Sequence, residues 1–121
     1  MFKLFSMEEA TRLIPVVNDH LNEMQDAVND TLRLRSEMSE LPAGSINIIN
    51  KTQEINFLVR SIQASKSELD KLGVFVQDVD AGLVDFPSQV GGEVVCLSWE
   101  KGQDAITHYH RLNEGTRLPL A

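Results

Sequence analysis

The sequence predicts an α+β fold in which a long antiparallel helical hairpin precedes a small antiparallel β-meander. Apolar residues recur at spacings of three and four through the first 72 residues, which is the period of a helix. From residue 74 the spacing falls to two, and short apolar runs alternate with glycine-containing turns, as in antiparallel strands. We therefore expect a single domain over residues 1–121, with helices over 7–40 and 46–72, the meander over 74–112 and a tail over 113–121.

The first helix is predicted to begin after Ser6. The run Ser6-Met7-Glu8-Glu9 has the pattern of a capping box, in which each end residue accepts a hydrogen bond from the backbone amide of the other. An apolar stripe follows: Leu13, Val17, Leu21, Met24, Val28, Leu32 and Met38. Pro15 lies within this stripe, and we expect it to kink or loosen the first turns because its ring clashes with an earlier carbonyl. Pro42 and Gly44 mark the break between the helices.

The second helix carries a more regular stripe, whose spacing alternates between four and three residues. Its members are Ile48, Thr52, Ile55, Val59, Ile62, Lys66 and Leu69, which is close to the heptad seam of a coiled coil. Lys66 interrupts the seam once. Gly73 follows Lys71 and Leu72, which is typical of a helix that ends in a glycine cap. The short connector makes the two helices antiparallel neighbours.

Beyond Gly73 the sequence predicts strands. Residues 74–79 and 83–86 have the composition of strands, and a turn separates them. The strongest prediction is a strand over 93–100, with Val95, Leu97 and Trp99 on one face and Val94, Cys96 and Ser98 on the other. Residues 104–112 fit either a fourth strand or a short helix.

Charge and cysteine content exclude several functions. The chain has 18 acidic and 11 basic residues, a net charge of −7, and no run of Lys or Arg. Nucleic acids and anionic membrane surfaces both attract clustered positive charge, so neither is an expected partner. The single Cys96 fits a reducing compartment. No apolar stretch reaches the ~18 residues of a membrane span, and residues 1–6 are too short for a signal peptide, so we expect a cytoplasmic protein.

Motifs along the chain resemble a known family. The most specific is Gly82-Leu83-Val84-Asp85-Phe86-Pro87. The others are Phe5-Ser6-Met7-Glu8-Glu9-Ala10 with Leu13-Ile14-Pro15, Leu97-Ser98-Trp99, Gly102 with Ile106, Tyr109-His110, and Gly115 with Arg117. These motifs are spread over nearly the whole chain, and through them the sequence resembles the prokaryotic family called domain of unknown function 2203. The resemblance implies no established activity.

Three positions depart from that family's pattern. Ser98 stands where a Cys is common, Gln103 where a Glu is common, and Tyr109 where a Trp is common. A Cys, Glu and His set would suit a metal ion, and of that set only His110 is present. The resemblance alone therefore does not support a metal site in this chain.

His108 and His110 form a His-x-His pair that is a candidate metal site. On a strand the two side chains share a face, roughly 7 Å apart, whereas on a helix they point apart. Neutral imidazoles bind divalent Zn, Ni, Cu or Fe ions, so a divalent transition metal is the candidate cofactor. Further ligands would come from Asp85, Cys96, Glu100 or Asp104. The alternative is an ordinary polar sheet face.

Asp85 lies in an apolar strand, where an unpaired carboxylate is costly. Its candidate partners are Arg117, Arg111, His108, His110 and the backbone amides near Gly82. We expect Arg117 to close the meander through Asp85, and a site carboxylate is the alternative. Trp99 is predicted to be a core residue or an interface anchor beside these two, which gives a predicted polar cluster of Asp85, Arg117 and Trp99. Cys96 next to a His could be a nucleophile, but its apolar strand favours an inert thiol.

The chain contains no familiar catalytic motif. It has no glycine-rich phosphate loop, no Cys-x-x-Cys, no His-Glu-x-x-His and no nucleophile elbow. We therefore predict a non-enzymatic interaction or scaffold module that acts as a homodimer through its apolar stripes and binds a further protein partner. The alternatives are a small metal-binding protein built on the His-x-His strand, and an enzyme that holds a small carboxylate or phosphate with Arg117 and Asp85.

Overall fold

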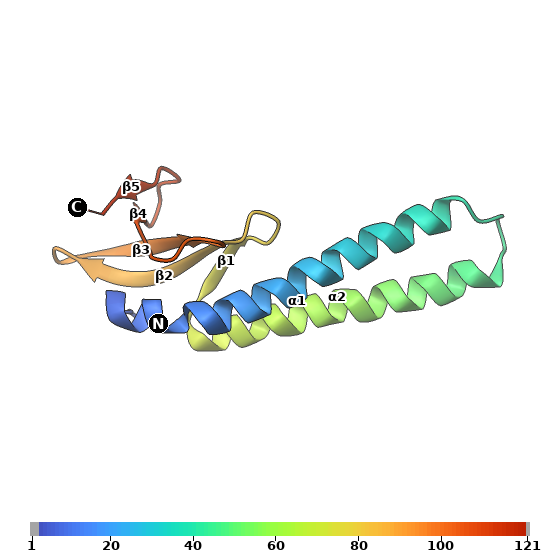
Figure 1. Cartoon of the computed structure of the whole chain (residues 1–121), viewed down its shortest axis with the longest axis horizontal. Coiled ribbons are helices and arrows are strands. Elements are labelled where there is room, and N and C mark those ends of the chain that lie inside the picture. The colour runs from blue at the N-terminus through green and yellow to red at the C-terminus, as the bar shows by residue number, and fades with distance from the viewer. Residues whose placement is uncertain (1–2, 121) are drawn as a thin grey trace.

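The computed structural model describes residues 3–120, so Met1, Phe2 and Ala121, the last residue of the predicted tail, lie outside the described residues. It confirms the predicted α+β fold. Helices α1 (Met7–Ser39) and α2 (Ile46–Leu72) form an antiparallel hairpin, and five antiparallel strands follow it (Figure 1). The strands are β1 (Phe75–Asp78), β2 (Leu83–Val90), β3 (Glu93–Glu100), β4 (His108–Arg111) and β5 (Leu118–Pro119), and they neighbour one another in chain order.

Two segments near the C-terminus needed the structure to assign them. The segment 104–112, which the sequence left open, contains a strand and no helix. The stretch predicted as a tail contains β5, which pairs with β4 through Tyr109 and Leu118. The loop between β4 and β5 therefore folds back over the sheet instead of leaving it.

Local sequence signals fix the helix ends. The Glu9 amide donates to Ser6 Oγ, and the Ser6 amide donates to Glu9 Oε1, both at 3.0 Å, so the predicted capping box is present. Helix α1 continues through Pro15. Helix α2 ends at Leu72 and is capped by Gly73, whose φ of 87° is left-handed. Within residues 3–120, neither helix combines the length and the apolar content needed to cross a membrane.

The seam between the helices differs from the predicted one. Ile48, Ile55, Ile62 and Leu69 are buried or half-buried, as the stripe requires. Between them, however, Lys51, Leu58 and Ser65 are more buried than Thr52, Val59 and Lys66. Ser65 faces α1 and donates from its hydroxyl to Glu23 Oε2 at 3.3 Å. The predicted interruption at Lys66 therefore disappears, because Lys66 lies outside the seam.

Helix α1 shows a similar rotation near the end of the hairpin. Thr31 and Leu34 are buried there, whereas Leu32, predicted for the stripe, is 58% exposed. The Thr31 hydroxyl donates to the Ala27 carbonyl at 2.8 Å, which satisfies the polar atom within the helix.

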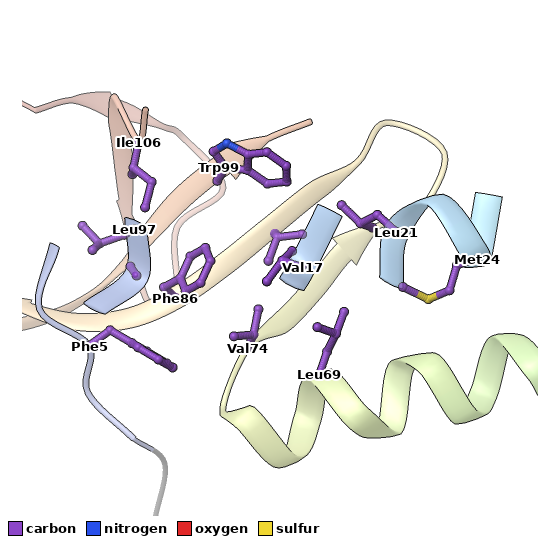
Figure 2. Packing of buried hydrophobic residues seen from close by; sticks show 12 residues of the cluster. Phe5, Val17, Leu21, Met24, Leu69, Val74, Phe86, Leu97, Trp99 and Ile106 are labelled. Atoms are coloured by element: carbon purple, nitrogen blue, oxygen red, sulfur yellow. The ribbon is translucent and has the colours of Figure 1, made fainter. Parts of the chain in front are cut away.

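The core lies where the hairpin meets one face of the sheet. Figure 2 shows Val17, Leu21 and Met24 of α1 and Leu69 of α2 gathered around Phe86, Leu97 and Trp99 of the sheet. The register pairs Val84 with Trp99 and Phe86 with Leu97, so alternate residues of β2 and β3 face the helices. Figure 1 shows the hairpin extending well beyond the sheet, so its distal part has only its own two helices to pack against.

The other face of the sheet carries the candidate site residues. Asp85 pairs with Ser98, and Ser98 pairs in turn with His108. Pro87 pairs with Cys96, and Cys96 pairs with His110. Because side chains alternate along a strand, all of these residues project from the face away from the hairpin.

Gly82 holds the β1–β2 turn against the loop that follows β3. Its φ is +70°, and its carbonyl accepts from the Lys101 amide at 2.9 Å. A Cβ atom at this position would lie 2.6 Å from Lys101 Cβ. The position therefore needs glycine for two reasons, its backbone conformation and the close approach of Lys101.

We expect Gly82→Ala to lower the free energy of unfolding by about 2–4 kcal/mol, from left-handed strain and overpacking together. Gly92→Ala is the matched control, since Gly92 has a φ of 81° with nothing within 4 Å of an added Cβ. The control should lose only about 1–2 kcal/mol. Urea unfolding followed by Trp99 fluorescence measures both. Equal losses in the two variants would contradict the steric role of Lys101.

Candidate functional site

Three side chains from adjacent strands meet on the face away from the hairpin. They are Asp85 of β2, Cys96 of β3 and His110 of β4, and one ligand atom from each lies within 4.8 Å of the others. The register explains the meeting, because Asp85 and His110 are diagonal neighbours across β3, and Cys96 lies between them. The group contains three of the six residues that the sequence offers as metal ligands.

His108, another of these candidates, lies on the same face but outside the group. Its Nδ1 lies 2.8 Å from Thr107 Oγ1. Residues two apart on one strand share a face at roughly 7 Å, so the two imidazoles would have to lean toward each other to bind one ion. The pairing of His108 with His110 on one ion therefore stays a prediction, and the group that the structure brings together contains only His110 of the two. His110 meets residues of neighbouring strands, and Glu100 and Asp104 are not in the group either.

Both ring nitrogens of His110 face oxygen atoms. Nε2 lies 2.7 Å from Asp85 Oδ2, and Nδ1 lies 3.0 Å from the Arg111 carbonyl oxygen. A neutral imidazole carries one N–H and cannot donate to both. If Nδ1–H donates to the carbonyl, then a proton or a metal ion has to lie between Nε2 and the carboxylate.

Burial and polar contacts act on His110 in opposite directions. Desolvation lowers its pKa, whereas the contacts with the Arg111 carbonyl and with Asp85 raise it, and the net result is a raised pKa. The Asp85 side chain is only 2% exposed and the His110 side chain 15%. Their interaction is therefore largely shielded from water. A buried charge pair is screened less than an exposed one.

Cys96 is a poor nucleophile in this setting. Burial, and secondarily the nearby Asp85 charge, raise the pKa of its thiol to about 11. The thiol is therefore protonated near neutral pH, and reactivity needs the thiolate. A bound metal ion would reverse this situation, because a coordinating thiol loses its proton.

Asp85 and His110 of this group line a pocket of about 440 Å³, whereas Cys96 is not part of its lining. Five residues line it from the sheet: Gln77 of β1, Leu83 and Asp85 of β2, Ser98 of β3 and His110 of β4. Its remaining wall is the loop between β4 and β5, through Leu112, Asn113, Glu114, Gly115 and Arg117. Sequence reasoning missed this wall because the loop was taken as a tail, and the apolar Leu118 and Leu120 were the only signal that it returns to the sheet.

Arg117 does not close the meander through Asp85 as predicted. The partner of Asp85 is His110, which reaches it from β4 at 2.7 Å. Arg117 is an exposed residue that lines the same pocket. Asp85, His110 and Arg117 thus converge on one cavity, but the ion pair predicted between the first and the last is replaced by an Asp85–His110 contact.

Trp99, the third member of the predicted polar cluster, lies on the opposite face. It is 2% exposed in the core, and its Nε1 donates to the Gln103 carbonyl at 3.0 Å. Gln103 Oε1 accepts from the Glu100 amide at 3.1 Å, so this residue serves the turn after β3. The absence of a Glu at position 103 therefore does not affect the group formed by Asp85, Cys96 and His110.

Comparison with known proteins gives a family and no activity. The profile of the family described as uncharacterized conserved protein (DUF2203) matches residues 3–118, which include both helices and the whole pocket wall. No curated protein and no solved structure matches the chain. The chain therefore belongs to the uncharacterized conserved protein family DUF2203.

Proposed function

We propose that the protein binds a divalent transition metal ion, with Zn²⁺ favoured, through Asp85, Cys96 and His110. The observation that carries the proposal is the approach of a carboxylate oxygen, a sulfur and a ring nitrogen to within 4.8 Å of one another at the edge of a pocket. Thiolate and imidazole ligands favour Zn²⁺ and its neighbours over Mg²⁺ or Ca²⁺. Three protein ligands leave a fourth position for water or a small molecule, which is the pattern of catalytic zinc sites.

The surroundings of His110 support this assignment. Histidines that bind metals usually donate their other ring N–H to a carbonyl or carboxylate, which fixes the tautomer. The Arg111 carbonyl, 3.0 Å from Nδ1, fills that role and leaves Nε2 facing Asp85. Tetrahedral ligands with bonds of about 2.0 Å lie roughly 3.3 Å apart, so the 2.7 Å contact between Nε2 and Oδ2 would have to widen slightly.

The charges also balance. Carboxylate and thiolate together offset the double charge of the ion, and the imidazole binds as a neutral ligand. Without an ion the same burial leaves Cys96 as a protonated thiol beside a carboxylate whose charge disfavours the thiolate. A metal therefore gives each of the three side chains a favourable partner.

We expect untagged protein, stripped of metal with a chelator, to bind one equivalent of Zn²⁺. Cys96→Ser and His110→Ala should each weaken binding by about 100-fold or more, since each removes a direct ligand. His108→Ala is the matched control and should bind as the wild type does. Competition with a chromophoric chelator measures the affinities, and circular dichroism checks folding. Binding that survives intact in folded His110→Ala protein would reject this ligand set.

Metal binding should also release protons and strengthen as the pH rises. With a thiol pKa of about 11, Cys96 must lose its proton to bind the metal even at pH 8. The raised pKa of His110 adds proton release as the pH falls. Calorimetry in two buffers of different ionisation enthalpy should give about one proton at pH 8 and more at pH 6. Cys96→Ser should lose the release seen at pH 8. A wild type that releases none would contradict thiolate ligation.

A second candidate function is self-association through the outward face of α2. Ile46, Ile49 and Phe57 are 65%, 55% and 67% exposed. With 3.6 residues per turn, they lie on the side of the helix opposite Ile48 and Ile55. On the same face Asn50, Gln53 and Asn56 carry no charge, and Arg60, one turn beyond Asn56, is basic. For a chain of net charge −7, this set of residues, none of which is acidic, lowers the repulsion that a second copy would meet.

Sedimentation velocity over a concentration series tests this candidate. We expect the wild type to dimerise and Phe57→Ser to weaken the dimer by about tenfold or more, since it removes a central aromatic anchor. Val90→Ser, at an exposed position on the sheet, is the control and should leave the dimer unchanged. A wild type that stays monomeric at every concentration would reject the candidate.

A further inference from the structure

We propose that the fourth position on the metal accepts an oxyanion, a carboxylate or phosphate group of a small molecule, which Arg117 binds at the same time. The inference rests on the proposed metal site and names the class of ligand that this site takes. It goes beyond metal binding because it assigns a role to the pocket and to a residue that does not ligate the metal.

The pocket has the size and composition for such a ligand. Its volume of about 440 Å³ falls within the range of small-molecule sites. Polar groups line it from both sides, with the Ser98 hydroxyl on the sheet, the Gln77 amide on β1 and the Asn113 amide on the loop. Each of these can donate a hydrogen bond to an oxyanion.

Arg117 supplies the positive charge. It is the one Lys or Arg among the described residues that line the pocket. Within residues 3–120, no Asp or Glu carboxylate lies within 4.0 Å of its guanidinium. The carboxylates of the described residues therefore leave its N–H donors available to a ligand. A guanidinium binds carboxylate and phosphate groups through two parallel N–H donors.

The charge balance explains why Arg117 favours an anion over water at the fourth position on the metal. A divalent ion bound by Asp85 and the Cys96 thiolate is neutral overall, so the metal centre by itself has no net charge with which to attract an anion. Glu114, also on the pocket wall, has its Oε2 3.8 Å from Arg111 Nη1, but Arg111 is paired more closely with Glu93, whose Oε1 lies 3.1 Å from Arg111 Nε. Arg117 is therefore the charge on the pocket wall that attracts an anion, against the opposing charge of Glu114, and an oxygen of that anion would complete the metal coordination.

The test uses Co²⁺ bound to the full chain, because its visible absorption reports changes in the ligands. We expect sodium acetate and inorganic phosphate, titrated separately, to replace water at the fourth position and change the Co²⁺ spectrum. The anion that binds more tightly indicates whether the pocket prefers a carboxylate or a phosphate group. Arg117→Gln should weaken anion binding by about tenfold or more while leaving Co²⁺ affinity unchanged. Arg117→Lys, which keeps the charge without the planar fork, should bind at an intermediate level. Arg35→Gln, which changes an exposed arginine on α1, is the control and should match the wild type.

The outcomes separate this inference from the metal proposal. If Co²⁺ does not bind, both fail. If Co²⁺ binds but neither anion changes its spectrum, the inference fails and the metal site stands. If Arg117→Gln binds the anions as well as the wild type does, the pocket does not recognise them through Arg117, and the inference fails in the same way.

Discussion

The buried carboxylate of Asp85 is the constraint on which the polar face of the sheet depends. Its side chain is 2% exposed within a central strand, where a charge without a partner is costly. His110 provides the partner from two strands away. A slip of one residue in the pairing of β4 would turn His110 to the opposite face. The contact therefore favours one register for a strand of only four residues.

The alternation of β2 and β3 lets a few residues serve both stability and chemistry. Val84 and Phe86 enter the hydrophobic core on either side of Asp85, which projects to the pocket. On β3, Leu97 faces the core, whereas Cys96 and Ser98 face the site. The hydrophobic packing of one face thus fixes the positions of the donors on the other. A rigid sheet places such groups more accurately than a loop does.

The features that could be predicted from the sequence are those with local causes. The capping box at Ser6, the glycine cap at Gly73 and the helical period depend on residues close together in the chain. The seam needed tertiary information, because the hydrophobic pattern did not favour Lys51 over Thr52. Lys51 is half-buried with its Nζ 2.7 Å from Glu37 Oε2, so its aliphatic stem lies along the seam while its charge is paired.

The candidate site shows the same division. Period-two alternation correctly placed Cys96 and Ser98 on the face opposite Trp99. The partner of Asp85 depended on two facts that the sequence did not supply, the strand identity of residues 104–112 and the register of β4 against β3. Once β4 is in place, His110 lies diagonal to Asp85 and beside Cys96, whereas His108 faces Ser98. Arg117 does not pair with Asp85 as predicted, because the His110 imidazole is already the partner of that carboxylate.

The nature of the cation between His110 and Asp85 depends on the third side chain. A proton would satisfy the two facing atoms, 2.7 Å apart, and would need nothing further from the protein. Under that arrangement a thiol beside the carboxylate brings no benefit, since the charge of Asp85 only disfavours its ionisation. A divalent ion uses all three groups, because it stabilises the thiolate that the carboxylate opposes. Cys96 Sγ lies within 4.8 Å of both partners. This position has a role if a metal ion is bound and none if a proton is bound. The metal proposal therefore rests on the three atoms together.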